Sequence, residues 1–193
     1  MNNQTNNNNG SEKQGPDSGR QTSDKAHAEF KLMMDEAEAA RMSKEDVFAK
    51  LLAWGVHPEI VFRLERIWEY TKRVGERMIH IGRLVLAKII EFIEAHPQMC
   101  IGAALGAAIG ILASGIPVLG HLLAPILVLI GAGFGAIVGH DLDREDKGLP
   151  GRFGGPIRQT IKSIVEIAQE FFRLFIVLIN IVIKSGATQE KPA

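Results

Sequence analysis

The chain has 193 residues, equal numbers of basic and acidic side chains (22 each), and one cysteine, Cys100. The balanced charge leaves no basic footprint of the kind that nucleic-acid binding requires, so we expect no nucleic-acid partner. A single cysteine excludes an intramolecular disulfide, and the polar start of the chain lacks the apolar segment of a cleavable signal peptide.

The first 24 residues are polar and carry six Asn among the first ten positions. This composition predicts a disordered arm, 1–24, followed by cytosolic helices over 25–96. The first of these helices is expected from Ala26 to Met42. Its predicted apolar face consists of Phe30, Met33, Ala37 and Ala40.

Local signals predict a short second helix and the start of a third. Ser43 and Asp46 form a capping-box pattern, in which the Ser43 hydroxyl accepts a free helix N–H. Gly55 is placed to end the short helix, and Pro58 suits the first turn of the next one.

One long amphipathic helix is predicted from Pro58 to about Ala95, as a stalk that leads to a junction at His96-Pro97. Its apolar residues alternate in steps of four and three along one seam. The seam is Ile60, Leu64, Ile67, Thr71, Val74, Met78, Ile81 and Val85.

The centre of the chain, Met99 to Gly139, runs for 41 residues without Asp, Glu, Lys or Arg. About 20 apolar residues suffice for one helix to cross a bilayer, so the run is about two crossings long. Gly115, Pro117 and Gly120 interrupt it near its middle, because proline lacks a backbone donor and glycine loosens the chain. We therefore predict a transmembrane helical hairpin over 97–140, with its turn at these residues.

Glycines recur every fourth residue in both arms of this hairpin. Such rows let helix backbones approach closely, either between the two arms or between subunits, and both arrangements stay open. The predicted packing residues are Gly102, Gly106, Gly110, Gly131, Gly135 and Gly139.

Basic residues flank the two ends of the apolar run, whereas its turn carries only His121. The positive-inside rule then places both termini in the cytoplasm, with the protein in a membrane that we expect to be the bacterial inner membrane. The flanking residues are Arg83, Lys88, Arg144, Lys147, Arg152 and Arg158.

A charged and Gly/Pro-rich loop is predicted over 141–156. Asp141, Asp143 and Glu145 alternate as calcium-loop ligands do, but the glycine and the final glutamate of that pattern are missing. We therefore expect neither a metal site nor a cofactor.

The last helix is predicted over 157–185, followed by a disordered tail, 186–193. Its four-three seam allows three placements: in the membrane interface, against the 58–95 helix, or in a bundle between subunits. The seam is Ile157, Ile161, Ile164, Ala168, Phe171, Phe175, Leu178 and Val182.

No HExxH, P-loop, paired-cysteine or GxSxG motif is present. The spacing of Arg73 and His80, Arg-x6-His, resembles the motif of HEPN-type helical ribonucleases, which would imply a membrane-tethered nuclease with this pair in its active site.

The junction EFIEAHPQMCIGAALGAAIGIL, residues 91–112, resembles that of small bacterial inner-membrane stress proteins, where an amphipathic helix meets a proline and a glycine-zipper membrane helix. The two-lobed apolar hairpin with helical flanks also resembles inclusion-membrane effectors and the buried hairpin of pore-forming colicins. These resemblances imply a glycine-zipper membrane hairpin.

The predicted fold is all-α: a membrane hairpin flanked by long amphipathic helices. The predicted function is that of a non-enzymatic anchor or scaffold that forms homo-oligomers in the lipid bilayer and presents its cytosolic helices to a protein partner. A membrane-perforating oligomer, holin-like, toxin-like or an effector, is the alternative, and the tethered ribonuclease is a third.

Overall fold

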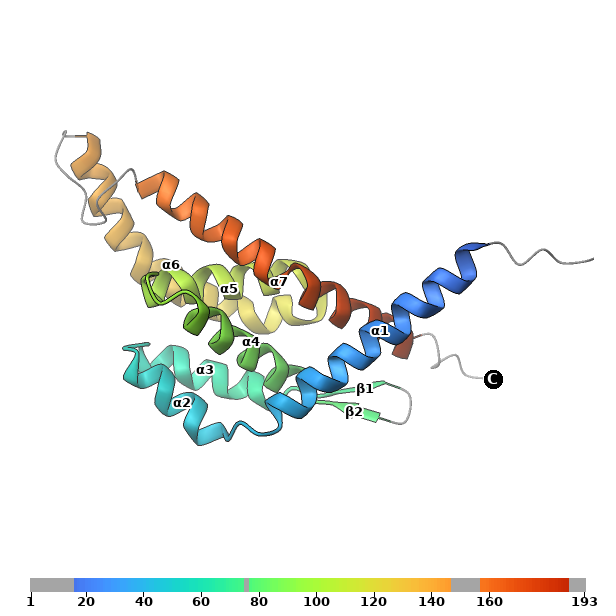
Figure 1. The fold of residues 1–193 in the computed structure, drawn as a ribbon. Coiled ribbons are helices and arrows are strands. Elements are labelled where there is room, and N and C mark those ends of the chain that lie inside the picture. Colours follow the sequence, from blue (N-terminus) through green and yellow to red (C-terminus); the bar gives the residue numbers. More distant parts are fainter. Residues whose placement is uncertain (1–15, 75–76, 147–156, 188–193) are drawn as a thin grey trace, which may run out of the picture.

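The computed structural model describes residues 16–74, 77–146 and 157–187, and over these residues it is almost entirely helical (Figure 1). At the level of secondary-structure content, the prediction of an all-α protein is confirmed. In chain order the elements are α1 (Pro16–Ala39), α2 (Lys44–Ala53), α3 (Pro58–Trp68), β1 (Lys72–Val74), β2 (Arg77–Ile79), α4 (Ile81–Ala95), α5 (Ile101–Gly115), α6 (Pro117–Asp146) and α7 (Ile157–Ala187).

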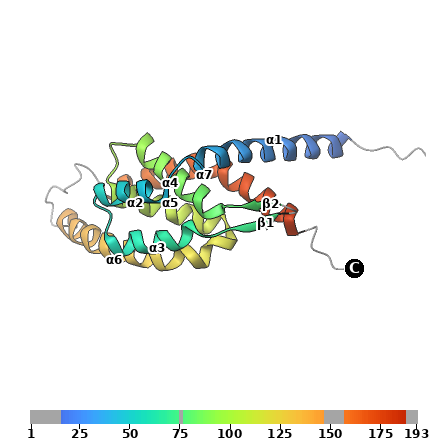
Figure 2. The same ribbon diagram turned by 90° about the horizontal axis from the view of Figure 1, so that it is seen from below.

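The apolar helix α5 lies at the centre of the fold. It contacts α4, α6 and α7, while α3 packs on both α4 and α6, and α1 packs on α7 and α4. Figure 2 shows α3 and α6 along one side of the molecule and α1 along the other. One continuous apolar core, from Leu32 in α1 to Val182 in α7, results from this arrangement.

The predicted single helix from Pro58 to Ala95 is wrong, because the structure divides it into α3, a two-stranded antiparallel hairpin and α4. The seam nevertheless identifies buried residues at both ends, since Leu64 and Ile67 are buried in α3 and Ile81 and Val85 in α4. Between them the chain reverses, so α4 folds back beside α3 rather than extending it as a stalk.

Gly82 explains why the chain turns back at this point. A Cβ atom on Gly82 would overlap the carbonyl oxygen of Ile67 and lie 2.7 Å from its carbonyl carbon. The Gly82 N–H also donates to the Tyr70 carbonyl oxygen at 2.9 Å. The first turn of α4 therefore rests directly on the backbone at the end of α3, an approach that only glycine allows.

The predicted apolar face of the first helix is also wrong. Phe30 and Met33 are exposed in α1, whereas Leu32, Asp35 and Ala39 are buried. The buried face of the helix thus combines apolar residues with a polar contact.

That contact joins Asp35 to Lys88 of α4, whose Nζ lies 3.5 Å from Asp35 Oδ1 and 2.6 Å from Glu91 Oε2. Burial lowers the pKa of Lys88, but the hydrogen bond to Glu91 and the charge of Asp35 outweigh it, so the pKa lies above its ordinary value. An ion pair inside an apparently apolar interface is a tertiary feature that helical periodicity does not reveal.

The local end signals of α2 and α3 are confirmed. The Asp46 N–H donates to Ser43 Oγ at 3.0 Å, Gly55 follows α2 with a positive φ of 80°, and Pro58 begins α3. His57 adds a cap that the sequence reading missed, because its Nδ1 accepts the Glu59 N–H at 3.3 Å.

Three predicted domain boundaries differ from the observed ones. Helix α1 begins at Pro16, inside the predicted arm, α6 continues into the predicted loop as far as Asp146, and α7 ends at Ala187, inside the predicted tail. The remaining parts of the arm, loop and tail, 1–15, 147–156 and 188–193, lie outside the described residues.

Candidate functional site

The hairpin of α5 and α6 turns at a single connecting residue. Helix α5 ends at Gly115 and α6 begins at Pro117, with Ile116 between them in an extended conformation and fully buried. The Leu119 N–H donates to the Ile116 carbonyl at 2.9 Å. Gly120, the third predicted turn residue, lies in the first turn of α6, where a Cβ atom would approach the Ala113 carbonyl oxygen to 3.3 Å.

The glycine row of α5 lies against α6 of the same chain. A Cβ atom on Gly106 would lie 3.1 Å from Ile130 Cγ2, and one on Gly110 would lie 3.9 Å from Leu127 Cδ2. These two glycines therefore let large aliphatic side chains of α6 pack onto the α5 backbone. Gly106 and Gly110 of the α5 row thus face α6 of the same chain, and packing between subunits stays a prediction.

Gly131 differs from the α5 row, because no atom lies within 4 Å of the position of its Cβ. Gly102, Gly106, Gly110 and Gly131 all line one apolar hollow of about 500 Å³ between α5, α6 and α7. The structure thus brings four of the six predicted glycines together. The surroundings of Gly135 and Gly139 lie outside the described part of α6.

The outer face of α6 is exposed and apolar over several turns. Val128 is 71% exposed. The other exposed residues of this face occur at three- and four-residue steps, and His121 is its one strongly polar member. We call this surface the α6 outer face; it consists of His121, Ala124, Pro125, Val128, Gly131 and Ala132.

Helix α7 holds the tip of the hairpin through a contact that the sequence reading missed. Asn180 Nδ2 donates to the Gly115 carbonyl oxygen at 2.7 Å, and Ile176 lies so close that a Cβ on Gly115 would be 2.5 Å from its Cδ1. The carbonyl of Gly115 lies in the last turn of α5, where no helical donor follows. Asn180 is the only polar residue between Leu174 and Ile183. This isolated amide in an apolar segment was the sequence signal for a buried polar contact.

The ribonuclease resemblance implies that Arg73 and His80 lie on one helix. In the structure they do not. Arg73 lies in β1, paired with Met78 of β2, and His80 precedes α4 without a side-chain cap bond. Both side chains are exposed. The helical setting of that motif is therefore absent at this pair.

The described residues also bear on the predicted metal and membrane features. They contain no group of three or more His, Cys, Asp or Glu side chains arranged to hold a metal ion. None of the helices in this part of the chain combines the length and apolar character needed to cross a membrane.

No family model matches the chain, and no curated protein or solved structure matches it significantly.

Proposed function

We propose that the protein is a non-enzymatic membrane protein that uses the α5–α6 hairpin as its bilayer anchor and presents its other helices as a scaffold. The observation that carries this proposal is the α6 outer face. It is an exposed apolar surface on a hairpin whose run from 99 to 139 contains no charged residue.

The length and connectivity of the hairpin favour attachment to one side of the bilayer through the α6 outer face, with α5 still packed in the fold. Helix α5 has 15 residues, so it is about 22 Å long, shorter than the hydrocarbon core of about 30 Å. Its one-residue link to α6 returns the chain to the side it came from. Both flanks then stay on the cytoplasmic side, as their basic residues favour.

In this proposal, the glycine contacts between subunits are made by α6 rather than by α5. Gly106 and Gly110 already contact side chains of α6, whereas Gly131, at the edge of the α6 outer face, is exposed and has no atom within 4 Å of its Cβ position. Helix association in lipid depends on such close packing of small residues. The proposed homo-oligomer therefore forms along the α6 outer face, next to lipid.

Val128→Glu tests the anchor. A charged side chain in the hydrocarbon costs roughly 3 kcal/mol, so co-flotation of the full-length protein with phospholipid vesicles should weaken about 100-fold. Because Val128 is 71% exposed, the fold should persist by circular dichroism. Gln169→Glu, an exposed site on α7, adds the same charge away from this face and should float like the wild type.

Failure of the wild-type protein to float, or equal flotation of Val128→Glu, would contradict the anchor. Chemical cross-linking of the vesicle-bound wild type should give species larger than one chain.

A membrane-perforating oligomer is the second candidate, and the burial of α5 favours it. Ala108, Ile109 and Leu112 are fully buried, so the α5 arm of the apolar hairpin is covered by the helices that pack on it, although the α6 arm keeps an exposed face. Insertion of α5 would require its separation from α7, which Asn180 and Ile176 oppose at the hairpin tip.

Asn180→Ala tests this candidate. Losing the bond to Gly115 removes about 1 kcal/mol of resistance to opening, so dye release from vesicles should become about fivefold faster. Gln169→Ala, which removes an exposed amide from the same helix, should leave the rate unchanged. Absence of dye release by both the wild type and Asn180→Ala would eliminate the pore and leave the anchor.

A further inference from the structure

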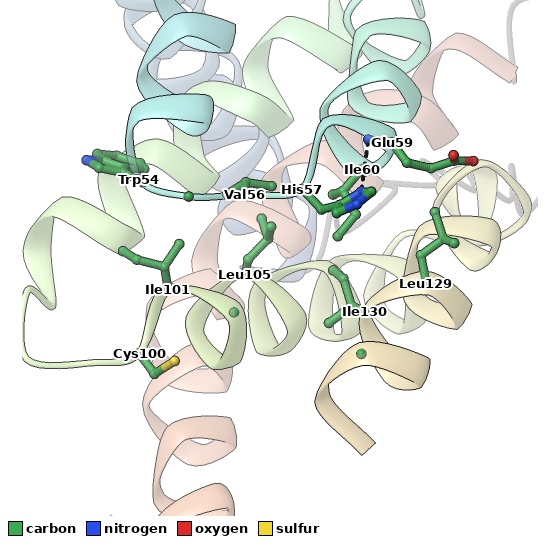
Figure 3. Close-up of a pocket in the computed structure, with 13 residues that line it drawn as sticks. Trp54, Val56, His57, Glu59, Ile60, Cys100, Ile101, Leu105, Leu129 and Ile130 are labelled. Carbon is green, nitrogen blue, oxygen red and sulfur yellow. Dashed lines mark hydrogen bonds between the residues drawn. The ribbon is translucent and has the colours of Figure 1, made fainter. Parts of the chain in front are cut away.

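A pocket of about 780 Å³ lies between the α2–α3 connection and the hairpin (Figure 3). Residues 54–60 form one wall, and residues 100–105 of the α5 start and 129–133 of α6 form the others. In Figure 3 the side chains of Ile101 and Leu105 project from α5 toward the connection. The pocket is thus an open hollow lined by three segments that are distant in sequence.

The lining is mainly apolar. Val56, Leu105 and Ile130 are buried residues of its wall, with Ile60 and Leu129 partly buried beside them. Ligand pockets typically measure about 300–1,000 Å³ and combine such walls with a few placed polar groups. The volume and lining therefore suit a single hydrocarbon chain.

Two polar residues of the pocket, His57 and Glu59, lie together at one end, and Trp54 lies at the other (Figure 3). His57 Nδ1 accepts the Glu59 N–H at 3.3 Å, so the neutral imidazole carries its proton on Nε2 and can donate it to a ligand. Glu59 is the one charged residue of the lining, and Arg63 Nη2 already donates to its carboxylate at 2.9 Å. Among the described residues of the lining, no unpaired charge is left to match a charged head group.

We infer that this pocket binds a single-chain amphiphile with an uncharged, hydrogen-bond-accepting head group, such as a fatty alcohol. The chain lies against Val56, Leu105 and Ile130, and the head group accepts from His57 Nε2. This inference goes beyond the proposed anchor and does not depend on it, because binding is measured without a bilayer.

Cys100 makes the inference testable, because it is the only cysteine of the chain, is exposed and lines the pocket. The full-length protein is held in amphipol, since a detergent is itself a single-chain amphiphile, and its modification by a maleimide is timed with and without 1-decanol. At about ten times its Kd, decanol should slow the reaction about tenfold. Decanoate and decyltrimethylammonium should bind at least about tenfold more weakly, because each would desolvate a charge without a partner.

Two matched glycines of α6 provide the variants. Neither Gly133 nor Gly131 has an atom within 4 Å of its Cβ position, so a side chain can be added at either without a clash at its Cβ. Gly133 lines this pocket, whereas Gly131 lines the separate hollow beside α7. Gly133→Leu should abolish protection by decanol, and Gly131→Leu should retain it.

Three results would overturn the inference: no saturable protection by decanol, equal protection in Gly133→Leu, or equal protection by the charged analogues. Protection of Cys100 that rises with protein concentration in the absence of decanol would also overturn it, because a second copy of the chain would then fill the pocket.

Discussion

Gly82→Ala is expected to lower the free energy of unfolding by about 3 kcal/mol or more. The added methyl would overlap the carbonyl oxygen of Ile67 and lie 3.1 Å from that of Trp68. Both are backbone atoms at the end of α3, so no rotamer change relieves the overlap. The whole of α4 must move away, which also breaks the bond from the Gly82 N–H to the Tyr70 carbonyl.

Thermal unfolding followed by circular dichroism measures this effect, and the midpoint should fall by about 6–12 °C in a chain of this size. Gly131→Ala is the control, because its Cβ meets no atom and alanine favours a helix interior by about 1 kcal/mol over glycine. The control should therefore match or exceed the wild type. A Gly82→Ala midpoint equal to that of the wild type would mean that α4 does not fold back on α3 as the structure has it.

The same glycine shows why part of the fold is not predictable from periodicity. A four-three seam continues across Thr71, Val74 and Met78 as if one helix ran through them, although Met78 is exposed and lies in β2. Glycine lowers the propensity of a segment for helix only modestly, so Gly82 gives little local indication that the predicted helix is broken there. Its decisive role appears only when α3 is close enough for backbone contact, which is a tertiary property.

The residues that signal helix ends predicted the structure better than the apolar helix faces did, because an end signal acts within one helical turn. Ser43, Gly55 and Pro58 cap or bound α2 and α3 as predicted. The apolar face of α1 was misplaced, because the helix buries Asp35 against Lys88 while Phe30 stays 63% exposed. A face assigned from hydrophobicity alone fails where an ion pair holds the interface.

The hairpin is the part of the candidate site that the sequence predicted best, since the structure turns the chain between Gly115 and Pro117. The contacts around it were not predictable in the same way. Asn180 meets Gly115 from 65 residues away, and the pocket joins His57 to Cys100 across two intervening helices. Such pairings depend on how α7 and the α2–α3 connection pack on α5, which no local pattern encodes.

An aromatic cluster joins α7 to α4 and determines which of the three predicted placements of the last helix applies. Phe172 is fully buried, with its ring centroid 5.2 Å from that of Phe92 and 5.0 Å from that of Phe171. His96 completes the cluster, 4.7 Å from the Phe92 centroid. These contacts place α7 against its own chain rather than in a bundle between subunits.

Phe172→Ala is therefore expected to cost about 3–5 kcal/mol in unfolding free energy, because a large cavity opens where α7 meets α4. Chemical denaturation gives the loss in stability, and limited trypsin digestion should cut α7 at Lys162 and Arg173 faster than in the wild type. Leu174→Ala is the matched control, since Leu174 is 55% exposed and its removal should change stability by no more than about 0.5 kcal/mol. If the two variants are equally stable, α7 does not pack within the chain, and its amphipathic seam would have to be satisfied by lipid or by another subunit.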